Sequence, residues 1–171
     1  MLRILGALCI LIGAGAAGFG FAASVRRQAR QLGELCAALE AMRCEIEYRM
    51  TPLPQLLEQL AQTCATPVGE LLLHWSRMLS DGDGATVSYA LRRAMESVRG
   101  LELPPQAVQE LTSLSVRMGR FDAAGQARSV ALAAERLRLM LAELEAGKRA
   151  RCRSYRTIGI CAGLALAVIL L

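Results

Sequence analysis

Residues 4–23 read ILGALCILIGAGAAGFGFAA, a run of twenty without a charged or strongly polar side chain. At a rise of about 1.5 Å per residue, a helix of this length covers about 30 Å, the thickness of a bilayer's hydrocarbon core. A cleaved signal peptide is the rival interpretation, because small residues flank Phe21 at suitable offsets. However, only Arg3 precedes the run, the run is long for a signal peptide, and arginines follow it closely. We therefore predict an uncleaved transmembrane helix over residues 1–24.

A second apolar segment, residues 157–171, reads TIGICAGLALAVILL and is uncharged. As a helix its fifteen residues cover only about 22 Å, so spanning requires Tyr155 or local thinning of the bilayer. We predict a second transmembrane helix here. Gly159 and Gly163 stand four residues apart, a spacing that permits close helix packing against the first segment or against another copy of the chain. Glycine is also common in membrane helices generally. Two interpretations therefore stay open: the two glycines form a packing face, or they have no particular role.

Charge is distributed unevenly along the chain, whose formal net charge is +5. Residues 31–147 hold all fifteen acidic residues but only eleven arginines, a balance of −4. The excess positive charge flanks the apolar segments, at Arg26, Arg27, Arg30, Lys148, Arg149, Arg151, Arg153 and Arg156. The positive-inside rule then predicts that the middle of the chain is cytoplasmic and that both termini face outward. Basic residues so placed favour contact with anionic lipid headgroups over nucleic-acid binding.

Residues 25–156 between the apolar segments have the pattern of an all-α domain. Apolar side chains recur at spacings of three and four residues in six stretches, with breakers between them at 51–52, 66–67, 81–84, 100–105 and 119–122. Thr51 and Thr66 each precede a proline, which predicts an N-cap followed by proline at the first helical position. Thr86 and Asp122 are predicted N-caps of the fourth and sixth helices. The connections are short, so we expect a compact antiparallel bundle of about six helices.

The sequence contains no arrangement of residues that predicts catalysis. There is a single histidine, His74, and no Cys-x-x-Cys pair among the six cysteines. No glycine-rich loop followed by lysine is present to cradle phosphates, and the Asp81–Gly84 stretch lacks the glutamate that a calcium loop requires. We predict a non-enzymatic protein without cofactor or metal, whose cysteines are reduced and serve as small apolar residues.

Two short motifs are similar to those of a known family. Glu45-Ile46-Glu47-Tyr48 followed by Thr51-Pro52-Leu53 resembles the end of the first soluble helix in the stage III sporulation protein AB family. Met118-Gly119-Arg120-Phe121-Asp122 with Gln126 resembles that family's Leu-Gly-x-x-Asp-x-x-x-Gln stretch, with Met118 where leucine is more usual. The order and spacing of these motifs agree over the whole chain. The residues that carry the resemblance are Tyr48, Thr51, Pro52, Leu53, Gly119, Asp122 and Gln126.

The resemblance implies a membrane subunit on the mother-cell side of the channel complex that joins mother cell and forespore, with both termini in the intermembrane space. The family's soluble domain is similar to the cytoplasmic helical bundle of the inner-membrane platform protein of type II secretion and type IV pilus systems. The implied partners are a cytoplasmic secretion-type ATPase and other membrane subunits, and the implied roles of Asp122 and Gln126 are structural. The alternative is a membrane-anchored helical scaffold of an unrelated secretion, division or signalling complex.

Overall fold

The computed structural model describes the backbone of residues 2–49, 51–81, 86–118 and 123–170, and the side chains of residues 23–49, 51–81, 86–118 and 124–147. Over these backbone ranges the chain forms helices and no strand, so the all-α prediction is confirmed. The six helices are α1 (Leu2–Tyr48), α2 (Leu53–Thr63), α3 (Val68–Ser80), α4 (Val87–Ser97), α5 (Pro105–Met118) and α6 (Ala123–Leu170). The chain divides into two compact units, residues 26–141 and residues 1–25 with 142–171.

The unit of residues 1–25 and 142–171 contains the beginning of α1 and the end of α6. Apart from residues 23 and 24, both predicted membrane segments lie outside the residues whose side chains are described. The same holds for Lys148, Arg149, Arg151, Arg153, Arg156, Gly159 and Gly163. Among the residues whose side chains the structure describes, 23–49, 51–81, 86–118 and 124–147, no helix has the length and apolar character needed to cross a bilayer. The two transmembrane helices therefore stay predictions.

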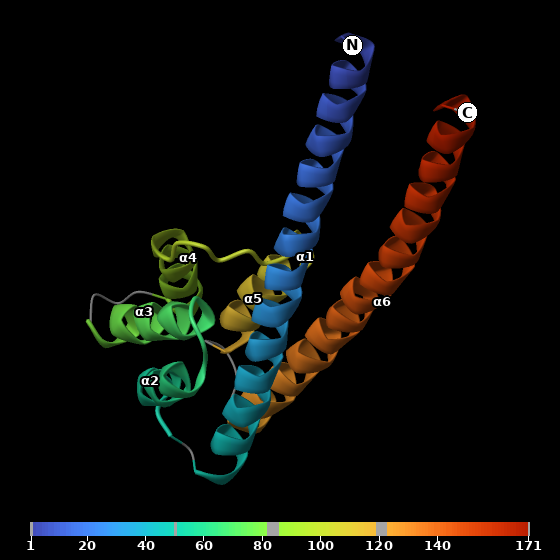
Figure 1. The fold of residues 1–171 in the computed structure, drawn as a ribbon. Helices are drawn as coiled ribbons and strands as arrows, with labels where there is room; N and C mark the ends of the chain where they lie inside the picture. Colours follow the sequence, from blue (N-terminus) through green and yellow to red (C-terminus); the bar gives the residue numbers. More distant parts are fainter. Residues whose placement is uncertain (1, 50, 82–85, 119–122, 171) are drawn as a thin grey trace. The chain divides into compact units, whose positions relative to one another are not determined.

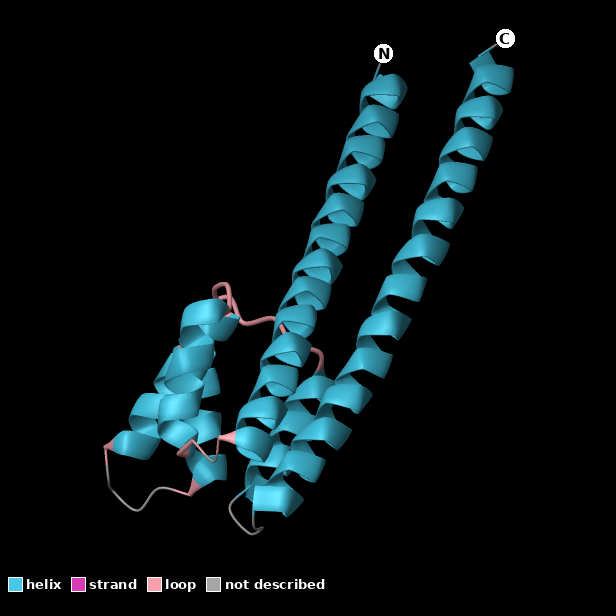
Figure 2. Cartoon of the chain, turned by 90° about the horizontal axis from the view of Figure 1, so that it is seen from below, coloured by secondary structure: helices cyan, strands magenta, loops and turns pink. Residues whose placement is uncertain are grey.

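Within the unit of residues 26–141, α1 and α6 run antiparallel. Arg138 of α6 lies 3.1 Å from Glu40 of α1, and a Cβ placed on Gly33 of α1 would lie 3.8 Å from Leu141 of α6. Later residues of α1 thus meet earlier residues of α6. In this unit α2, α3 and α4 lie on one side of α1 and α6 on the other (Figures 1 and 2).

The core of this unit consists of the apolar stripes that the sequence predicts. Their fully buried members recur at spacings of one, three, four or seven residues, which place them on one face of each helix. They include Leu32, Leu35, Leu39 and Met42 of α1, Leu56 and Leu57 of α2, Leu71, Leu72 and Trp75 of α3, Leu91 of α4, Leu111 and Leu114 of α5, and Val130 and Leu137 of α6.

Helices α2 and α3 approach each other closely at Gly69. A Cβ at this position would lie 2.7 Å from the carbonyl oxygen of Cys64 and 2.8 Å from that of Ala61, distances that real Cβ atoms do not show. Ser76 of α3 donates a hydrogen bond of 2.7 Å to the carbonyl of Pro54 in α2. The missing side chain of Gly69 therefore lets α3 begin directly against the end of α2.

The helix starts agree only in part with the predicted caps. The hydroxyl of Thr86 accepts a hydrogen bond from the amide of Tyr89 at 3.3 Å, which confirms Thr86 as the N-cap of α4. The prediction of Thr51 as an N-cap is wrong, because α2 begins at Leu53 and Pro52 takes the cap position without a side-chain bond. Pro54 supplies the proline of the first turn, so the start lies one residue later than predicted.

The N-cap predicted at Thr66 is also wrong. Pro67 takes the cap position of α3, and no side chain caps this end of the helix. The predicted cap Asp122 lies outside the described residues.

Candidate functional site

The two family motifs meet at one end of the unit of residues 26–141. Because α1 and α6 are antiparallel, Tyr48 at the end of α1 and Gln126 in the first turn of α6 lie at the same end of this unit (Figure 1). We call this the motif end and define it as the described residues of 45–53 and 118–126. The motifs are about seventy residues apart in sequence, so their meeting depends on the pairing of α1 with α6.

Tyr48 is the most prominent surface feature of the motif end. Two positions earlier Ile46 is buried, which anchors the last turn of α1, while Tyr48 is 83% exposed. No other large apolar side chain that the structure describes is as exposed. An exposed tyrosine on a rigid helix offers a large apolar ring and a polar tip, the combination that is enriched at the centres of protein interfaces.

Other contacts at the motif end are the ion pair of Arg49 with Glu45 at 3.5 Å and several backbone and amide hydrogen bonds. Thr51 and Leu53 are half-buried and Pro52 is exposed, with the carbonyl of Pro52 accepting from the amide of Leu56 at 3.0 Å. The amide group of Gln126 donates to the carbonyl of Met118 at 3.0 Å and so joins the start of α6 to the end of α5. Gly119 and Asp122 lie outside the described residues.

The opposite end of α1 in this unit is basic. Arg26 and Arg30 are exposed, and Arg27 forms an ion pair of 2.9 Å with Glu102, with both side chains partly exposed to solvent. Glu102 belongs to the loop of residues 98–104 that joins α4 to α5. We call this the basic end and define it as residues 26–31 and 98–104.

Gln31 fastens this loop to α1 and was missed by the sequence reasoning. Its side chain is 2% exposed, and its amide nitrogen donates to the carbonyl of Gly100 at 2.9 Å. Its amide oxygen accepts from the backbone amide of Glu102 at 2.7 Å. Gly100 has a φ of +77°, which glycine adopts without strain. One of two glutamines in a charged stretch, Gln28 and Gln31, carries no sequence signal of such a role.

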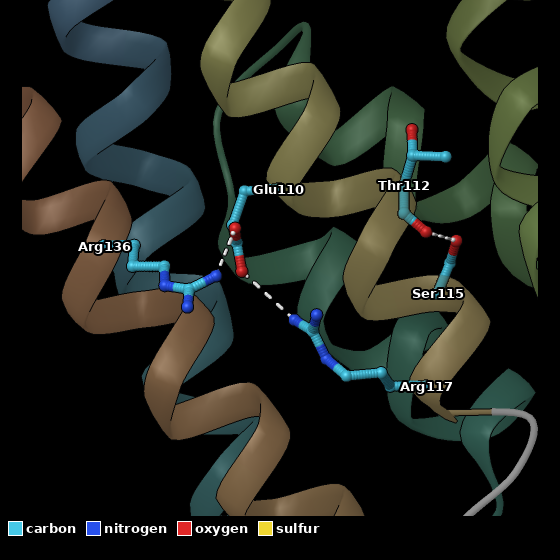
Figure 3. Close-up of polar contacts among 5 residues, drawn as sticks. All are labelled: Glu110, Thr112, Ser115, Arg117 and Arg136. Carbon is cyan, nitrogen blue, oxygen red and sulfur yellow. Dashed lines mark hydrogen bonds and ion pairs between the residues drawn. The ribbon is translucent and has the colours of Figure 1, made fainter.

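A second polar cluster that the sequence reasoning missed joins α5 to α6 (Figure 3). The carboxylate of Glu110 lies 3.1 Å from Arg117 of the same helix and 2.9 Å from Arg136 of α6. The Glu110 side chain is only 10% exposed, whereas that of Arg136 is 49% exposed. The seven-residue spacing of Glu110 and Arg117 along α5 places both on one helix face, which was the available signal.

Two of the described cysteine thiols are poorly reactive. Burial raises the pKa of the Cys36 thiol, an effect that Arg138 partly offsets and Glu40 adds to. Burial also raises the pKa of the Cys64 thiol, against a hydrogen bond from Thr63 that lowers it and with Glu34 raising it further. Protonated thiols are poor nucleophiles. Among the described residues, no group of three or more histidine, cysteine, aspartate or glutamate side chains is placed to hold a metal ion.

Comparison with known proteins identifies the family. The family whose sequence model is described as stage III sporulation protein AB matches residues 3–171. The chain belongs to the stage III sporulation protein AB family. The resemblance predicted from the two motifs is thus confirmed, and the family is named for a stage of sporulation and not for a reaction.

Two individual proteins agree with this assignment. The chain is 29% identical over 174 residues to stage III sporulation protein AB of Bacillus subtilis (strain 168), and the match covers all of both chains. It is also similar to a solved structure of stage III sporulation protein AB, with 27% identity and a TM-score of 0.66. That match covers 72% of this chain and 98% of the solved chain.

Proposed function

We propose that this chain is a non-enzymatic membrane platform subunit of the stage III sporulation channel or secretion complex between mother cell and forespore. In this role it links a cytoplasmic secretion-type ATPase to the membrane components of the complex. Its two apolar segments anchor it in the mother-cell membrane, with the helical unit in the cytoplasm and both termini in the intermembrane space.

The observation that carries this proposal is the placement of the two ends of the helical unit. Along α1, Arg27 of the basic end and Tyr48 of the motif end are separated by twenty-one residues, or about 32 Å at the α-helical rise. The basic end follows the first apolar run in sequence, as expected of residues beside anionic headgroups. The motif end is then about 30 Å along α1 from the basic end, which leaves it available to a cytoplasmic partner.

The predicted topology has a direct test in reporter fusions. Eight basic residues flank the apolar segments on their inner sides, against Arg3 and the N-terminal amine on the other side. The positive-inside rule therefore predicts that the position after Leu171 lies outside the cytoplasm. A fused reporter that is active only outside the cytoplasm should then be active there. Activity of a cytoplasm-dependent reporter at this position would contradict the proposed arrangement of the termini.

The ATPase contact has a test with a matched pair of exposed tyrosines. Tyr48 stands at the motif end, whereas Tyr89 is 56% exposed on α4. If the motif end binds the ATPase, Tyr48→Ala removes an exposed aromatic anchor, and we expect co-purified ATPase to fall about tenfold or more. Tyr89→Ala is the control and should retain the ATPase. Equal recovery of the ATPase with both variants would refute the motif end as its binding surface.

A further inference from the structure

The loop of residues 98–104, between α4 and α5, has a fixed place beside the first turns of α1 in the helical unit. We propose that this loop contacts the membrane surface and forms, together with Arg26 and Arg30, a binding surface for anionic phospholipid headgroups. The inference rests on the membrane anchoring in the proposed function and extends it to a segment remote in sequence from both apolar runs.

Chain connectivity keeps this loop close to the end of the first apolar run. Arg27 comes four residues after Ala23, the last residue of that run, and four residues span at most about 14 Å in any conformation. In the helical conformation of α1 the same step is about 6 Å. The Arg27 side chain then reaches Glu102 of the loop at 2.9 Å. The helical step is comparable with the polar headgroup layer, which adds about 5 to 8 Å on each side of the hydrocarbon core.

The loop is held to α1 by buried contacts, so its position relative to α1 is fixed. Gln31 is 2% exposed and forms hydrogen bonds to both Gly100 and Glu102. The left-handed φ of Gly100 gives the turn a conformation that other residues rarely adopt. The position of Arg99 and Leu101, on either side of Gly100, is therefore set by α1 itself.

The charge of this surface matches an anionic membrane. Arg26, Arg30 and Arg99 are exposed, while Arg27 is already paired with Glu102, the one acidic residue of the loop. This leaves three positive charges at one end of the unit. Each basic residue near an anionic lipid surface strengthens binding by about fivefold. The half-buried Leu101 beside Arg99 adds apolar surface, which suits the mixed polar and apolar environment of the headgroup layer.

Fluorescence quenching by headgroup-labelled lipid tests this contact in the full chain. The six native cysteines are replaced by serine or alanine, and a single fluorophore is attached at Leu101→Cys or at Val116→Cys, the exposed control site near the far end of α5. The protein is reconstituted in nanodiscs of phosphatidylcholine with or without phosphatidylglycerol, doped with a nitroxide-headgroup lipid. We expect quenching at position 101 to be at least twofold stronger than at position 116, and strongest with phosphatidylglycerol.

A pair of charge reversals tests the electrostatic part of the inference. Arg99→Glu should reduce quenching at position 101 by about half or more in phosphatidylglycerol nanodiscs. Arg128→Glu, a reversal of an exposed arginine at the start of α6, should leave it unchanged. If quenching at position 101 changes neither with Arg99→Glu nor with phosphatidylglycerol, the anionic-headgroup contact is overturned. Protection of position 101 that appears only when other subunits are added would assign the loop to a protein partner instead.

Carbonate extraction separates failure of this inference from failure of the proposed function. If the chain resists extraction but position 101 is no more quenched than position 116, the loop contact is refuted and the anchored platform stands. If carbonate releases the chain and neither position is quenched, both the loop contact and the membrane anchoring are refuted.

Discussion

Two groups of helices in the unit of residues 26–141 are held together in different ways. Helices α2, α3 and α4 follow one another in sequence and pack through apolar side chains, with short-range bonds such as that from Trp75 to the carbonyl of Val87 at 3.2 Å. Helices α5, α6 and α1 bury apolar side chains as well, and in addition α5 and the loop before it are joined to α6 and α1 by charged and amide groups. Gln31 and Glu102 are 71 residues apart in sequence. Both groups gain stability from burial, and the second also gains a defined register from paired polar atoms.

The largest effect is expected from Trp75 in the apolar group. Trp75 is 2% exposed, and Trp75→Ala would leave a large cavity between α3 and α4, which should lower the free energy of unfolding by about 3 to 5 kcal/mol. Urea unfolding of the full chain in detergent, followed by circular dichroism, measures this loss. Trp75→Phe keeps most of the volume and should cost about 1 to 2 kcal/mol. A loss for Trp75→Ala as small as that for Trp75→Phe would contradict the packing described.

The next largest effect is expected at Glu110 in the polar group. Glu110→Ala leaves the guanidinium groups of Arg117 and Arg136 without their shared carboxylate. Since Arg136 is half-exposed and can be rehydrated, we expect a loss of about 1 to 3 kcal/mol, below that of a fully buried pair. The fluorescence of Trp75, the single tryptophan, reports unfolding.

A matched exposed pair and a double-mutant cycle sharpen this prediction. Glu96 pairs with Arg93 on α4 with both side chains more than half exposed, so Glu96→Ala should cost less than about 0.5 kcal/mol. A cycle of Glu110→Ala with Arg136→Ala should show a coupling energy of about 1 kcal/mol. Absence of coupling would mean that the ion pair of Glu110 with Arg136 does not contribute to stability.

A smaller effect is expected at Gln31. Gln31→Leu keeps the side-chain volume but leaves the Gly100 carbonyl and the Glu102 amide without their partner, at a cost of about 1 to 2 kcal/mol. Hydrogen exchange at the Glu102 amide should accelerate, because the bond that protects it is lost. Gln62→Leu, at an exposed position of α2, is the control and should change neither quantity. Unchanged protection at Glu102 in Gln31→Leu would show that the loop holds itself in place.

The smallest effect is expected at the helix caps. Thr86→Ala removes a capping bond of 3.3 Å and should cost about 0.5 to 1 kcal/mol, at the lower end for an N-cap. Thr66→Ala should be close to neutral in the same urea titration, because no side chain caps α3. Equal losses for the two variants would contradict the difference between these helix starts.

The sequence allows prediction of one group of helices far better than the other. The apolar stripes of α2, α3 and α4, and the cap at Thr86, are local patterns whose partners lie within a few turns of chain. Gln31 acquires its role only when segments remote in sequence meet, and Glu110 has a local indication of Arg117 but none of Arg136 in α6. The N-cap prediction for Thr51 was wrong because either Pro52 or Pro54 could be the proline of the first turn of α2. The sequence does not indicate which of the two it is.

For the candidate site, the motif residues could be named from the sequence but their assembly could not. Tyr48 and Gln126 each lie within four residues of a breaker, which indicates that they stand near helix ends. That they share one end of the unit follows from the antiparallel contact of Glu40 with Arg138, which has no local signature. The exposure of Tyr48 likewise depends on which face of α1 the other helices cover.

The antiparallel pairing of α1 and α6 has a consequence for the order of synthesis on the ribosome. The side of α1 that faces α6 carries Gly33, Cys36 and Glu40. About seventy-five residues separate the end of α1 from the start of α6, which corresponds to about 4 to 15 s of translation. Helices α2 to α4 are synthesised within this interval, whereas α6, the last helix to pack against α1, is synthesised only after it. Nascent chains that stop before α6 should therefore display this side of α1 to chaperones and proteases.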